Sequence, residues 1–391
     1  MKRIDLTTVA SVLLLTGFGM LVVYSTGGAV HLTRQLLFLP AALAALITCY
    51  FVPRRFIQGI AEPAYIFSLA LLALVLVVGS GPGSNRWFLL GPVSFQPSEL
   101  AKLTTVILLA KQLSSLRTVT FRPKSLFLPI AICLAPAVLI LAEPDLSTTI
   151  ILLAVLAAML YWAGLPALHV LFLFTPLISF AAGFSLYSWI PYFLVFTLIV
   201  FRPAALGRAL SALGVSLFFG LLSPLSLHAL KGYQADRIRN FLAPWLDPHG
   251  VGWNAIQSRI AIGSGQLLGK GFMRGTQNRL GFLPNRHTDF VFSCVGEEFG
   301  LLGSAVVLAL FALLISRFLF IARATRDRFD SLLCIGCAAI VACQVFINIG
   351  MLLGLLPITG ISLPFISYGG SSLVLNFAIV GLLFNVAAKP E

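Results

Sequence analysis

The sequence predicts an all-α polytopic membrane protein with about twelve transmembrane helices. Hydrophobic residues make up 59% of its 391 residues and charged residues only 10%, whereas average soluble domains carry about 25% charged residues. The apolar residues also gather in long runs, and a spanning helix needs roughly 20 of them. The predicted spans are residues 7–26, 34–52, 63–79, 97–115, 125–142, 146–163, 167–184, 187–201, 206–227, 300–322, 331–353 and 364–387.

The basic residues give these spans an orientation. With a cytoplasmic amino terminus, the inside loops carry most of the Lys and Arg residues and the short outside loops carry almost none, as the positive-inside rule requires. This pattern predicts the cytoplasmic (inner) membrane with both termini cytoplasmic. The same pattern explains the net charge of +13, because the basic residues set the topology of the chain and contact membrane lipids. A nucleic-acid partner is therefore not expected. The inside residues are Lys2, Arg3, Arg54, Arg55, Lys111, Arg117, Arg122, Lys124, Arg202, Arg208, Arg317, Arg323, Arg326, Arg328 and Lys389.

Three parts follow one another along the chain. A first helix block covers 1–227, a long polar extracytoplasmic loop covers 228–299, and a second helix block covers 300–391. Within the loop, residues 254–262 have a moderately apolar helical pattern, and the glycine-rich run 263–271 follows. Such pieces are typical of interfacial elements packed over a bundle, where irregular backbone must be buried or line a wet cavity. We therefore expect a cavity that opens to the outer face.

Asp289 is the first candidate for chemistry. It ends a polar stretch in a chain with only 13 acidic residues, directly after Arg286, His287 and Thr288. One interpretation is a general base whose field is shaped by these neighbours. The other is an N-cap for a helix that starts at Phe290, since Asp is a favoured N-cap residue. The sequence leaves both interpretations open.

A basic, glycine-rich run precedes Asp289. Lys270, Arg274, Arg279 and Arg286 fall within 17 positions and lie among several glycines. Glycines allow close backbone approach, and cations at this density suit a phosphate or pyrophosphate. The alternative is attraction to anionic lipid headgroups.

Charged and conformationally special residues also occur beside the spans. Glu99 and Lys102 lie one turn apart near the outer start of the predicted span 97–115, where they either pair locally or line a cavity. Glu143 and Asp145 flank a proline in a tight outer turn, where they either bind a cation or keep the turn hydrated. The proline- and glycine-rich segment 356–372 indicates a broken entry into the last helix, or close helix packing alone.

Distinctive motifs occur along the chain: Arg86-Trp87, Phe95 to Lys102, Glu143-Pro144-Asp145-Leu146, Asp236-Arg237, Pro244 to Pro248, Gln257-Ser258 to Gly271, His287 to Phe290, Glu297-Glu298 and Leu363 to Ser372. In this order they resemble the SEDS family (shape, elongation, division and sporulation), the integral membrane proteins that include RodA and FtsW. The resemblance covers nearly the whole chain. Gly275-Thr276-Gln277 and Phe282-Leu283-Pro284 are similar to the RodA branch, whereas Gly296 is closer to FtsW usage.

The resemblance implies a peptidoglycan glycosyltransferase that polymerises lipid II on the outer face of the cytoplasmic membrane. It also implies a class B penicillin-binding protein as the transpeptidase partner, and an essential role for Asp289. The family usually has about ten spans, so a hairpin within 164–204 is extra in this chain. Asn285 stands where Glu is common in the family, and Ser147 stands where Gly is common.

The chemistry of the implied reaction assigns roles to these residues. The leaving group of the donor sugar is a lipid pyrophosphate, which needs its charge neutralised more than it needs a proton, so one carboxylate base and a set of cations would suffice. Asp289 is the predicted catalytic base for the acceptor 4-hydroxyl. Mg²⁺ or Mn²⁺ would fit a pyrophosphate, but no cluster forms a metal-ligand set, and no organic cofactor is expected. The substrate-binding candidates are Lys270, Arg274, Arg279, Arg286, His287, Glu99 and Lys102.

Other functions fit parts of the same pattern. A flippase of the lipid-linked precursor would also have many spans, a central cavity and intramembrane charges. A division-specific polymerase of the FtsW type would share the chemistry, and a non-catalytic scaffold would share only the membrane fold. Loss of polymerisation on changing Asp289 to Asn separates the polymerases from the other two.

Overall fold

The computed structural model describes residues 5–80, 86–90, 93–116, 118–201, 206–226, 241 and 251–388. These residues are mostly helical, as the composition predicts, and one two-stranded antiparallel sheet pairs Phe88 with Phe95. The elements are α1 (Leu6–Phe51), α2 (Arg54–Gly59), α3 (Ala61–Val78), β1 (Phe88–Leu90), β2 (Val93–Phe95), α4 (Pro97–Ser115), α5 (Pro123–Ala142), α6 (Leu146–Trp162), α7 (Ala167–Ala182), α8 (Leu186–Phe201), α9 (Leu206–Ser226), α11 (Val251–Ser264), α12 (Thr276–Arg279), α13 (Val291–Ala324), α14 (Arg328–Leu352) and α15 (Gly370–Ala387).

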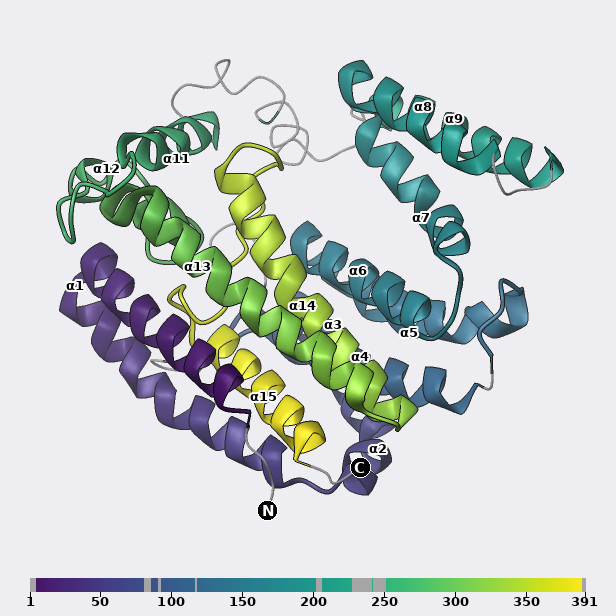
Figure 1. Cartoon of the computed structure of the whole chain (residues 1–391), viewed down its shortest axis with the longest axis horizontal. Helices are drawn as coiled ribbons and strands as arrows, with labels where there is room; N and C mark the ends of the chain where they lie inside the picture. The colour runs from purple at the N-terminus through teal and green to yellow at the C-terminus, as the bar shows by residue number, and fades with distance from the viewer. Residues whose placement is uncertain are drawn as a thin grey trace. The chain divides into compact units, whose positions relative to one another are not determined.

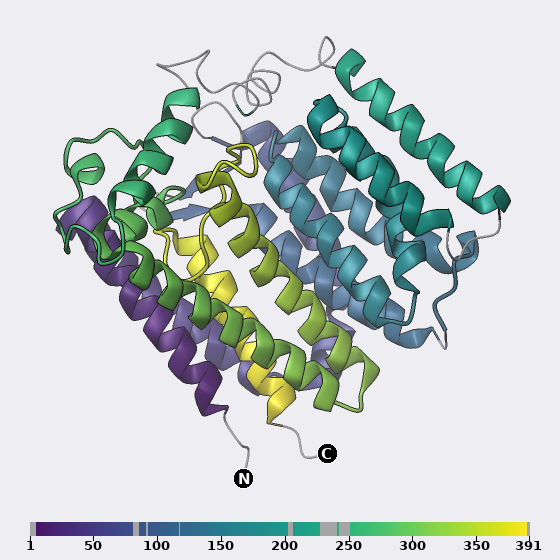
Figure 2. The same cartoon turned by 45° about the horizontal axis from the view of Figure 1, so that its top comes forward.

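Helix α1 is in fact two helices that meet at Gly28. This residue has φ 70° and ψ −170°, a conformation that glycine adopts without a steric penalty. The two halves lie side by side, so the chain reverses at Gly28 (Figures 1 and 2). The first two predicted spans, 7–26 and 34–52, are these two halves.

The other predicted spans also coincide with helices of the described residues. Seven of the described helices are long and apolar enough to cross a membrane, and α6, α7 and α8 are shorter apolar helices. Helix α4 carries Glu99, Lys102 and Lys111, which lower its hydropathy. The predicted all-α polytopic fold is therefore confirmed as a class.

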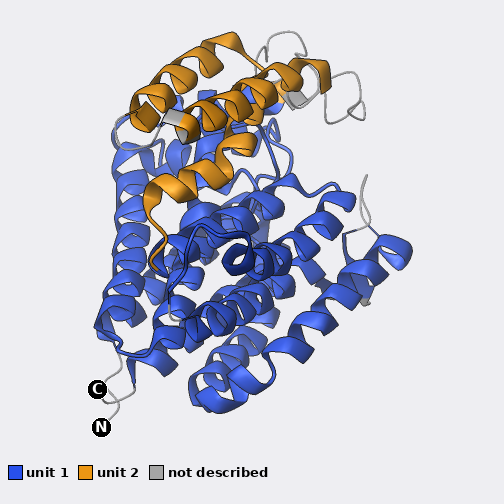
Figure 3. Cartoon of the chain, turned by 90° about the vertical axis from the view of Figure 1, so that its right-hand side faces the viewer, with its two compact units in different colours: residues 1–163, 254–391 blue, residues 164–253 orange. Residues whose placement is uncertain are grey.

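The chain divides into two compact units (Figure 3). Unit 1 comprises residues 1–163 and 254–391, and unit 2 comprises 164–253. In the described part of unit 2, α7, α8 and α9 pack on a small core of Phe196, Val200 and Ala209. The hairpin predicted as extra, within 164–204, corresponds to α7 and α8. The predicted division into 1–227, 228–299 and 300–391 follows chain order and stays a prediction.

Within unit 1, α14 and α15 are the most deeply buried helices. Helix α14 packs against α13, α6 and α4, and α15 packs along both halves of α1 (Figures 1 and 2). Small residues permit this close packing: a Cβ on Gly381 would lie 2.4 Å from the carbonyl oxygen of Leu46. The core of unit 1 is therefore built from the first and last parts of the sequence.

The two ends of unit 1 differ in chemistry. The end that holds Asp5 and Ala388, here called the terminal end, gathers several of the basic residues that the positive-inside rule assigns to the cytoplasm. The other end, here called the motif end, carries the turn at Gly28 and the stretch before α13. At the terminal end, ion pairs join Arg54 to Asp327 and Asp330, Lys111 to Glu62, and Arg317 to Asp5.

Candidate functional site

The motif end is organised around a break in α13. Gly300 has φ 65° and ψ −161°, which separates a half-helix, 291–299, from a long helix, 301–324. A broken helix leaves unpaired backbone groups, and these must be satisfied inside the protein at membrane depth. The segment 266–271 supplies the partners. Its hydrogen bonds run from Lys270 N to Glu297 O (2.9 Å), Gly271 N to Glu298 O (3.0 Å), Leu301 N to Gln266 O (2.8 Å) and Leu302 N to Leu267 O (3.1 Å).

The glycines of this segment allow that approach. A Cβ on Gly265 would lie 1.9 Å from the carbonyl oxygen of Gly296, and one on Gly269 would lie 2.2 Å from that of Glu298. The amides of Lys270 and Gly271 donate to protein carbonyls. The glycine-rich run thus has a structural use beside the anion cradle that its composition predicts.

Two adjacent buried acids, Glu297 and Glu298, form hydrogen bonds with the rest of the loop before α13. Glu297 is fully buried and its Oε1 accepts hydrogen bonds from Lys270 Nζ (2.8 Å), Thr276 Oγ1 (2.9 Å) and Gln277 N (3.1 Å). Glu298 is 1% exposed and accepts from Ser25 Oγ and from Asn278 Nδ2 (3.0 Å). These carboxylates tie the half-helix to the loop and to the turn of α1.

The four predicted phosphate-binding cations do not form one cluster of equivalent groups. Lys270 is paired with Glu297. Arg286 is half-buried, and its guanidinium donates to the backbone carbonyls of Thr26 and Asn278. Arg274 and Arg279 are exposed. Two of the cations therefore hold the loop together, and phosphate binding by any of the four stays a prediction.

The stretch before α13 is a tight turn closed by Asn285. Its carbonyl accepts hydrogen bonds from the amides of Thr288 (3.0 Å), Asp289 (3.1 Å) and Phe290 (3.4 Å). Asn285 has φ 53°, and Asn tolerates this left-handed conformation better than most residues. This geometry gives a physical reason for an Asn at position 285.

The opposite side of this turn is held by segments from the end of the chain. The carbonyls of His287, Thr288 and Asp289 accept hydrogen bonds from Tyr368 N (2.8 Å), Ser367 Oγ (2.6 Å) and Asn348 Nδ2 (3.0 Å), respectively. Ser367 and Tyr368 belong to the nonhelical segment before α15, which the prolines and glycines of 356–372 predict. Asn348 lies in α14 and was not predicted, although a polar residue inside an apolar span is a signal for such a role.

Asp289 itself is half-buried at the motif end. Helix α13 starts at Val291, and the N-cap position is Phe290, which makes no side-chain cap bond. The helix therefore starts one residue later than the capping interpretation assumed, and the roles of the Asp289 carboxylate as a cap and as a base both stay predictions. The carboxylate lies close to Gly360, where a Cβ would be 3.3 Å from Asp289 Oδ2.

His287 is part of a group of three rings. Its ring centroid lies 4.3 Å from that of His31 and 5.6 Å from that of Tyr368. Burial, with the nearby His31 and Arg286, lowers the pKa of His287 to about 4. His287 is thus neutral near pH 7 and would act on a substrate as a hydrogen-bonding ring, not as a cation.

A polar cavity of about 550 Å³ adjoins these rings. It opens between the turn of α1 and the stretch before α13, and Arg286 and His287 lie in its wall. A cavity is therefore present at the motif end, but Asp289, Glu99 and Lys102 are not among the residues that line it. That it opens to the outer face of the membrane stays a prediction. It is lined by Ser25, Thr26, Gly27, Gly28, His31, Gly281, Leu283, Pro284, Asn285, Arg286 and His287.

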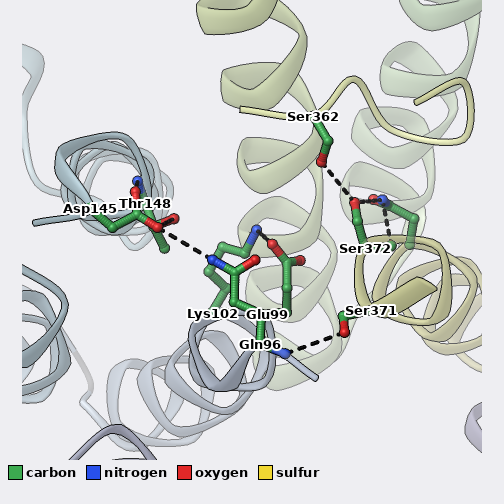
Figure 4. A network of polar contacts seen from close by, with 9 residues as sticks. Gln96, Glu99, Lys102, Asp145, Thr148, Ser362, Ser371 and Ser372 are labelled. Atoms are coloured by element: carbon green, nitrogen blue, oxygen red, sulfur yellow. Dashed lines mark hydrogen bonds and ion pairs between the residues drawn. The ribbon is translucent and has the colours of Figure 1, made fainter. Parts of the chain in front are cut away.

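Glu99 and Lys102 form a buried ion pair. Lys102 Nζ lies 2.9 Å from Glu99 Oε1, and Lys102 and Glu99 are 1% and 7% exposed, respectively. Figure 4 shows this pair beside Gln96, which contacts Asp145 Oδ2 through its amide (3.5 Å) and Ser371 Oγ through its backbone N–H (3.3 Å). The local pairing that the sequence allowed is present, and a role with substrate stays a prediction.

Glu143 and Asp145 have different surroundings in their shared turn. Asp145 is the N-cap of α6 and accepts from Thr148 N and Thr148 Oγ1. Glu143 is 1% exposed, and Arg86 donates to its backbone carbonyl. Burial, aided by the charge of Asp145 and opposed by Arg86, raises the pKa of Glu143 to about 8 from 4.5.

This shift predicts a pH-dependent cost to stability. Between pH 4.5 and 8 the unfolded chain ionises Glu143 while the folded protein keeps it protonated, so the free energy of unfolding falls as pH rises. Changing Glu143 to Gln should therefore raise the Tm at about pH 8.5 and much less at about pH 5, as measured by thermal unfolding in detergent. The exposed Glu62, changed to Gln, is the control. An equal gain at both pH values would contradict the expected linkage.

Comparisons with known proteins agree with this fold. The family described as FTSW_RODA_SPOVE, cell cycle protein, matches residues 4–192 and 187–391. The peptidoglycan glycosyltransferase MrdB of Escherichia coli (strain K12) is 34% identical over 390 residues, which cover 98% of this chain and 93% of MrdB. A chain from a structure described as "Structural coordination of polymerization and crosslinking by a peptidoglycan synthase complex" matches with a TM-score of 0.75 and 31% identity, over 98% of this chain and 97% of that chain. The rod shape determining protein RodA of Thermus thermophilus matches with a TM-score of 0.65 and 29% identity, over 98% and 96% of the two chains.

Proposed function

The chain belongs to the family of cell cycle proteins that comprises FtsW, RodA and SpoVE, and on that premise we propose that it is a peptidoglycan glycosyltransferase that polymerises lipid II. The observation that carries the site assignment is the main-chain geometry around Asp289. Its turn is closed by Asn285 on one side and held by Tyr368, Ser367 and Asn348 on the other. A half-buried carboxylate on a fixed backbone suits a catalytic base.

In the proposed reaction, Asp289 accepts the proton of the acceptor 4-hydroxyl as that oxygen attacks the anomeric carbon of the donor sugar. The bond between this carbon and the pyrophosphate oxygen breaks, and the lipid pyrophosphate leaves with the electron pair. Cations that face the leaving group stabilise its charge. Arg274 and Arg279 are the candidates with exposed side chains. Lys270 and Arg286 already make structural contacts, so they would bind the pyrophosphate through N–H groups that those contacts do not use.

The remaining predicted contacts take polar roles in this proposal. His287, neutral near pH 7, would hydrogen-bond a sugar hydroxyl from the wall of the polar cavity. Glu99 and Lys102 would contribute as a neutral pair, because each compensates the charge of the other. These three assignments rest on position and charge and await substitution experiments.

We expect a divalent cation to be bound mainly by the phosphates of the substrate and not by a set of protein side chains. Among the described residues there is no group of three or more His, Cys, Asp or Glu side chains that could hold a metal ion. Mg²⁺ is commonly bound through one or two carboxylates together with substrate phosphates. We propose that Mg²⁺ or Mn²⁺, where required, accompanies the pyrophosphate as part of the substrate.

The partner and the location are proposed on the same premise. The multi-pass chain would lie in the cytoplasmic membrane with its terminal end in the cytoplasm and its motif end outside, as the positive-inside rule predicts. A class B penicillin-binding protein would supply the transpeptidase, in keeping with the peptidoglycan synthase complex that one matching structure describes. Similarity to the rod shape determining protein RodA supports a role in elongation. A division-specific polymerase stays the alternative, because a protein described as "Probable peptidoglycan glycosyltransferase FtsW" is 33% identical over 98% of this chain.

The test is gel analysis of glycan made from purified lipid II, with and without a co-purified class B transpeptidase. We expect ladders of polymer in which the partner raises the yield. The rival function, a lipid II flippase, would move labelled lipid II across liposomes and produce no polymer under either condition. That second outcome would remove the glycosyltransferase assignment from this chain.

A further inference from the structure

Three consecutive carbonyls, those of His287, Thr288 and Asp289, have donors that are far away in the sequence. Two of the donors are side chains: Ser367 Oγ at 2.6 Å from Thr288 O, and Asn348 Nδ2 at 3.0 Å from Asp289 O. These two hydrogen bonds hold the main chain on either side of the Asp289 Cα atom. The amide of Asp289 is held as well, since it donates to Asn285 O (3.1 Å).

The buried surroundings of Asn348 hold its side chain in this contact. The residue is fully buried in α14, and its Nδ2 group donates both to Asp289 O and to Ile361 O (2.6 Å). Its Oδ1 atom is buried and has no hydrogen-bond partner in the described part of the chain. A buried amide oxygen without a partner costs stability, so packing alone would favour an apolar residue here.

Ser367 makes a matching link in the segment before α15. Its hydroxyl donates to Thr288 O and accepts from Leu363 N (2.8 Å), and the residue is 5% exposed. The hydroxyl therefore bridges two main-chain segments, one of which is the turn that ends in Asp289.

We propose that Asn348 and Ser367 are positioning residues for the Asp289 carboxylate. With the backbone fixed at residues 288 and 289, the position of the Asp289 carboxylate depends only on its two side-chain torsions. A carboxylate that must meet the acceptor hydroxyl gains from this restriction, because a misplacement of about 1 Å costs on the order of 10²-fold in rate. Neither residue has to touch the substrate. The inference rests on the proposed function, since it assumes that Asp289 is the base.

The test compares Asn348→Leu and Ser367→Ala with wild type in the purified full-length chain. Leu is close to Asn in size and removes both hydrogen bonds, and Ala removes only the hydroxyl. For each variant we expect kcat for glycan synthesis to fall about 10- to 100-fold, with the KM for lipid II and the binding of fluorescent lipid II unchanged. Ser367→Thr keeps a hydroxyl and should recover most of the rate.

Asn385→Leu is the matched control. Asn385 also donates its amide to backbone carbonyls, those of Cys49, Tyr50 and Val52, but it does so at the terminal end. It should change thermal stability and leave kcat near the wild-type value. A general loss of packing would lower activity in Asn348→Leu and Asn385→Leu alike.

The outcomes separate this inference from the proposed function. Wild-type kcat in both Asn348→Leu and Ser367→Ala would overturn the positioning role, even if Asp289→Asn is inactive in the same assay. Full activity of Asp289→Asn would instead remove the base on which the inference depends. Should Asn348→Leu fail to fold, the comparison of Ser367→Ala with Ser367→Thr decides alone, and equal rates for these two would overturn the proposal.

Discussion

Replacing Asp289 with Asn should lower the rate of glycan polymerisation by about 10² to 10⁴-fold, the range that a positioned general base contributes. Asn is nearly identical in shape but cannot accept the proton of the acceptor hydroxyl. The carbonyl of residue 289 would keep its bond to Asn348, so the turn should persist. The measurement is the initial rate of glycan formation from purified lipid II, together with binding of fluorescent lipid II, which should stay near the wild-type value.

The control for this substitution is Glu62→Gln, which makes the same carboxylate-to-amide change in an exposed side chain at the terminal end. It should polymerise like wild type. Polymerisation by Asp289→Asn at a rate close to that of Glu62→Gln would show that Asp289 is not the base. Loss of lipid II binding in Asp289→Asn would point instead to a binding role.

Adding a single methyl group at Gly265 should disrupt the motif end. A Cβ at this position would lie 1.9 Å from the carbonyl oxygen of Gly296, a backbone atom that cannot move without displacing the half-helix 291–299. We expect Gly265→Ala to cost about 3 kcal/mol or more in the free energy of unfolding, at the upper end of overpacking effects. Thermal unfolding in detergent and the glycan assay should both report the loss.

Gly263 offers a control two residues away. It lies in α11, and a Cβ placed on it would meet no atom within 4 Å. Ala has a higher helix propensity than Gly by about 1 kcal/mol, so Gly263→Ala should keep or slightly raise the Tm. Equal behaviour of the two variants would contradict the close packing of 265–271 against the break in α13.

The spans could be predicted because their signal is local. A run of apolar residues of sufficient length forms a helix in a membrane whatever surrounds it, and each of the twelve predicted spans coincides with a helical segment of the described residues. The family prediction from the motifs is confirmed by the comparisons. The topological side of each loop follows from charge alone and stays a prediction.

The burial of the half-helix 291–299 could not be predicted in the same way. The half-helix contains Glu297 and Glu298, so its composition assigned it to the polar outer loop. In the folded protein both acids are buried, because Lys270, Ser25 and Asn278 come from other parts of the chain to compensate them. Tertiary partners of this kind leave no periodic pattern in the sequence.

The glycine-rich run shows a related limit. Glycines beside cations favour a phosphate cradle when only the local sequence is considered, and the same glycines are required where a loop enters a broken helix. Only the fold shows that the amides of Lys270 and Gly271 serve the carbonyls of Glu297 and Glu298. Asn348 was missed because it lies 59 positions from Asp289, and nothing in the local sequence links these two residues.

Chemical rescue tests the central claim, that the carboxylate of residue 289 removes the acceptor proton, most directly. Asp289→Ala should make almost no glycan from purified lipid II, and added formate should restore synthesis in proportion to its concentration, because a small carboxylate can occupy the vacated space. Formate should not restore Asp289→Asn, whose amide fills that space. Wild-type polymerisation by Asp289→Ala without formate, or no rescue in a variant that binds lipid II normally, would contradict the assignment of Asp289 as the base.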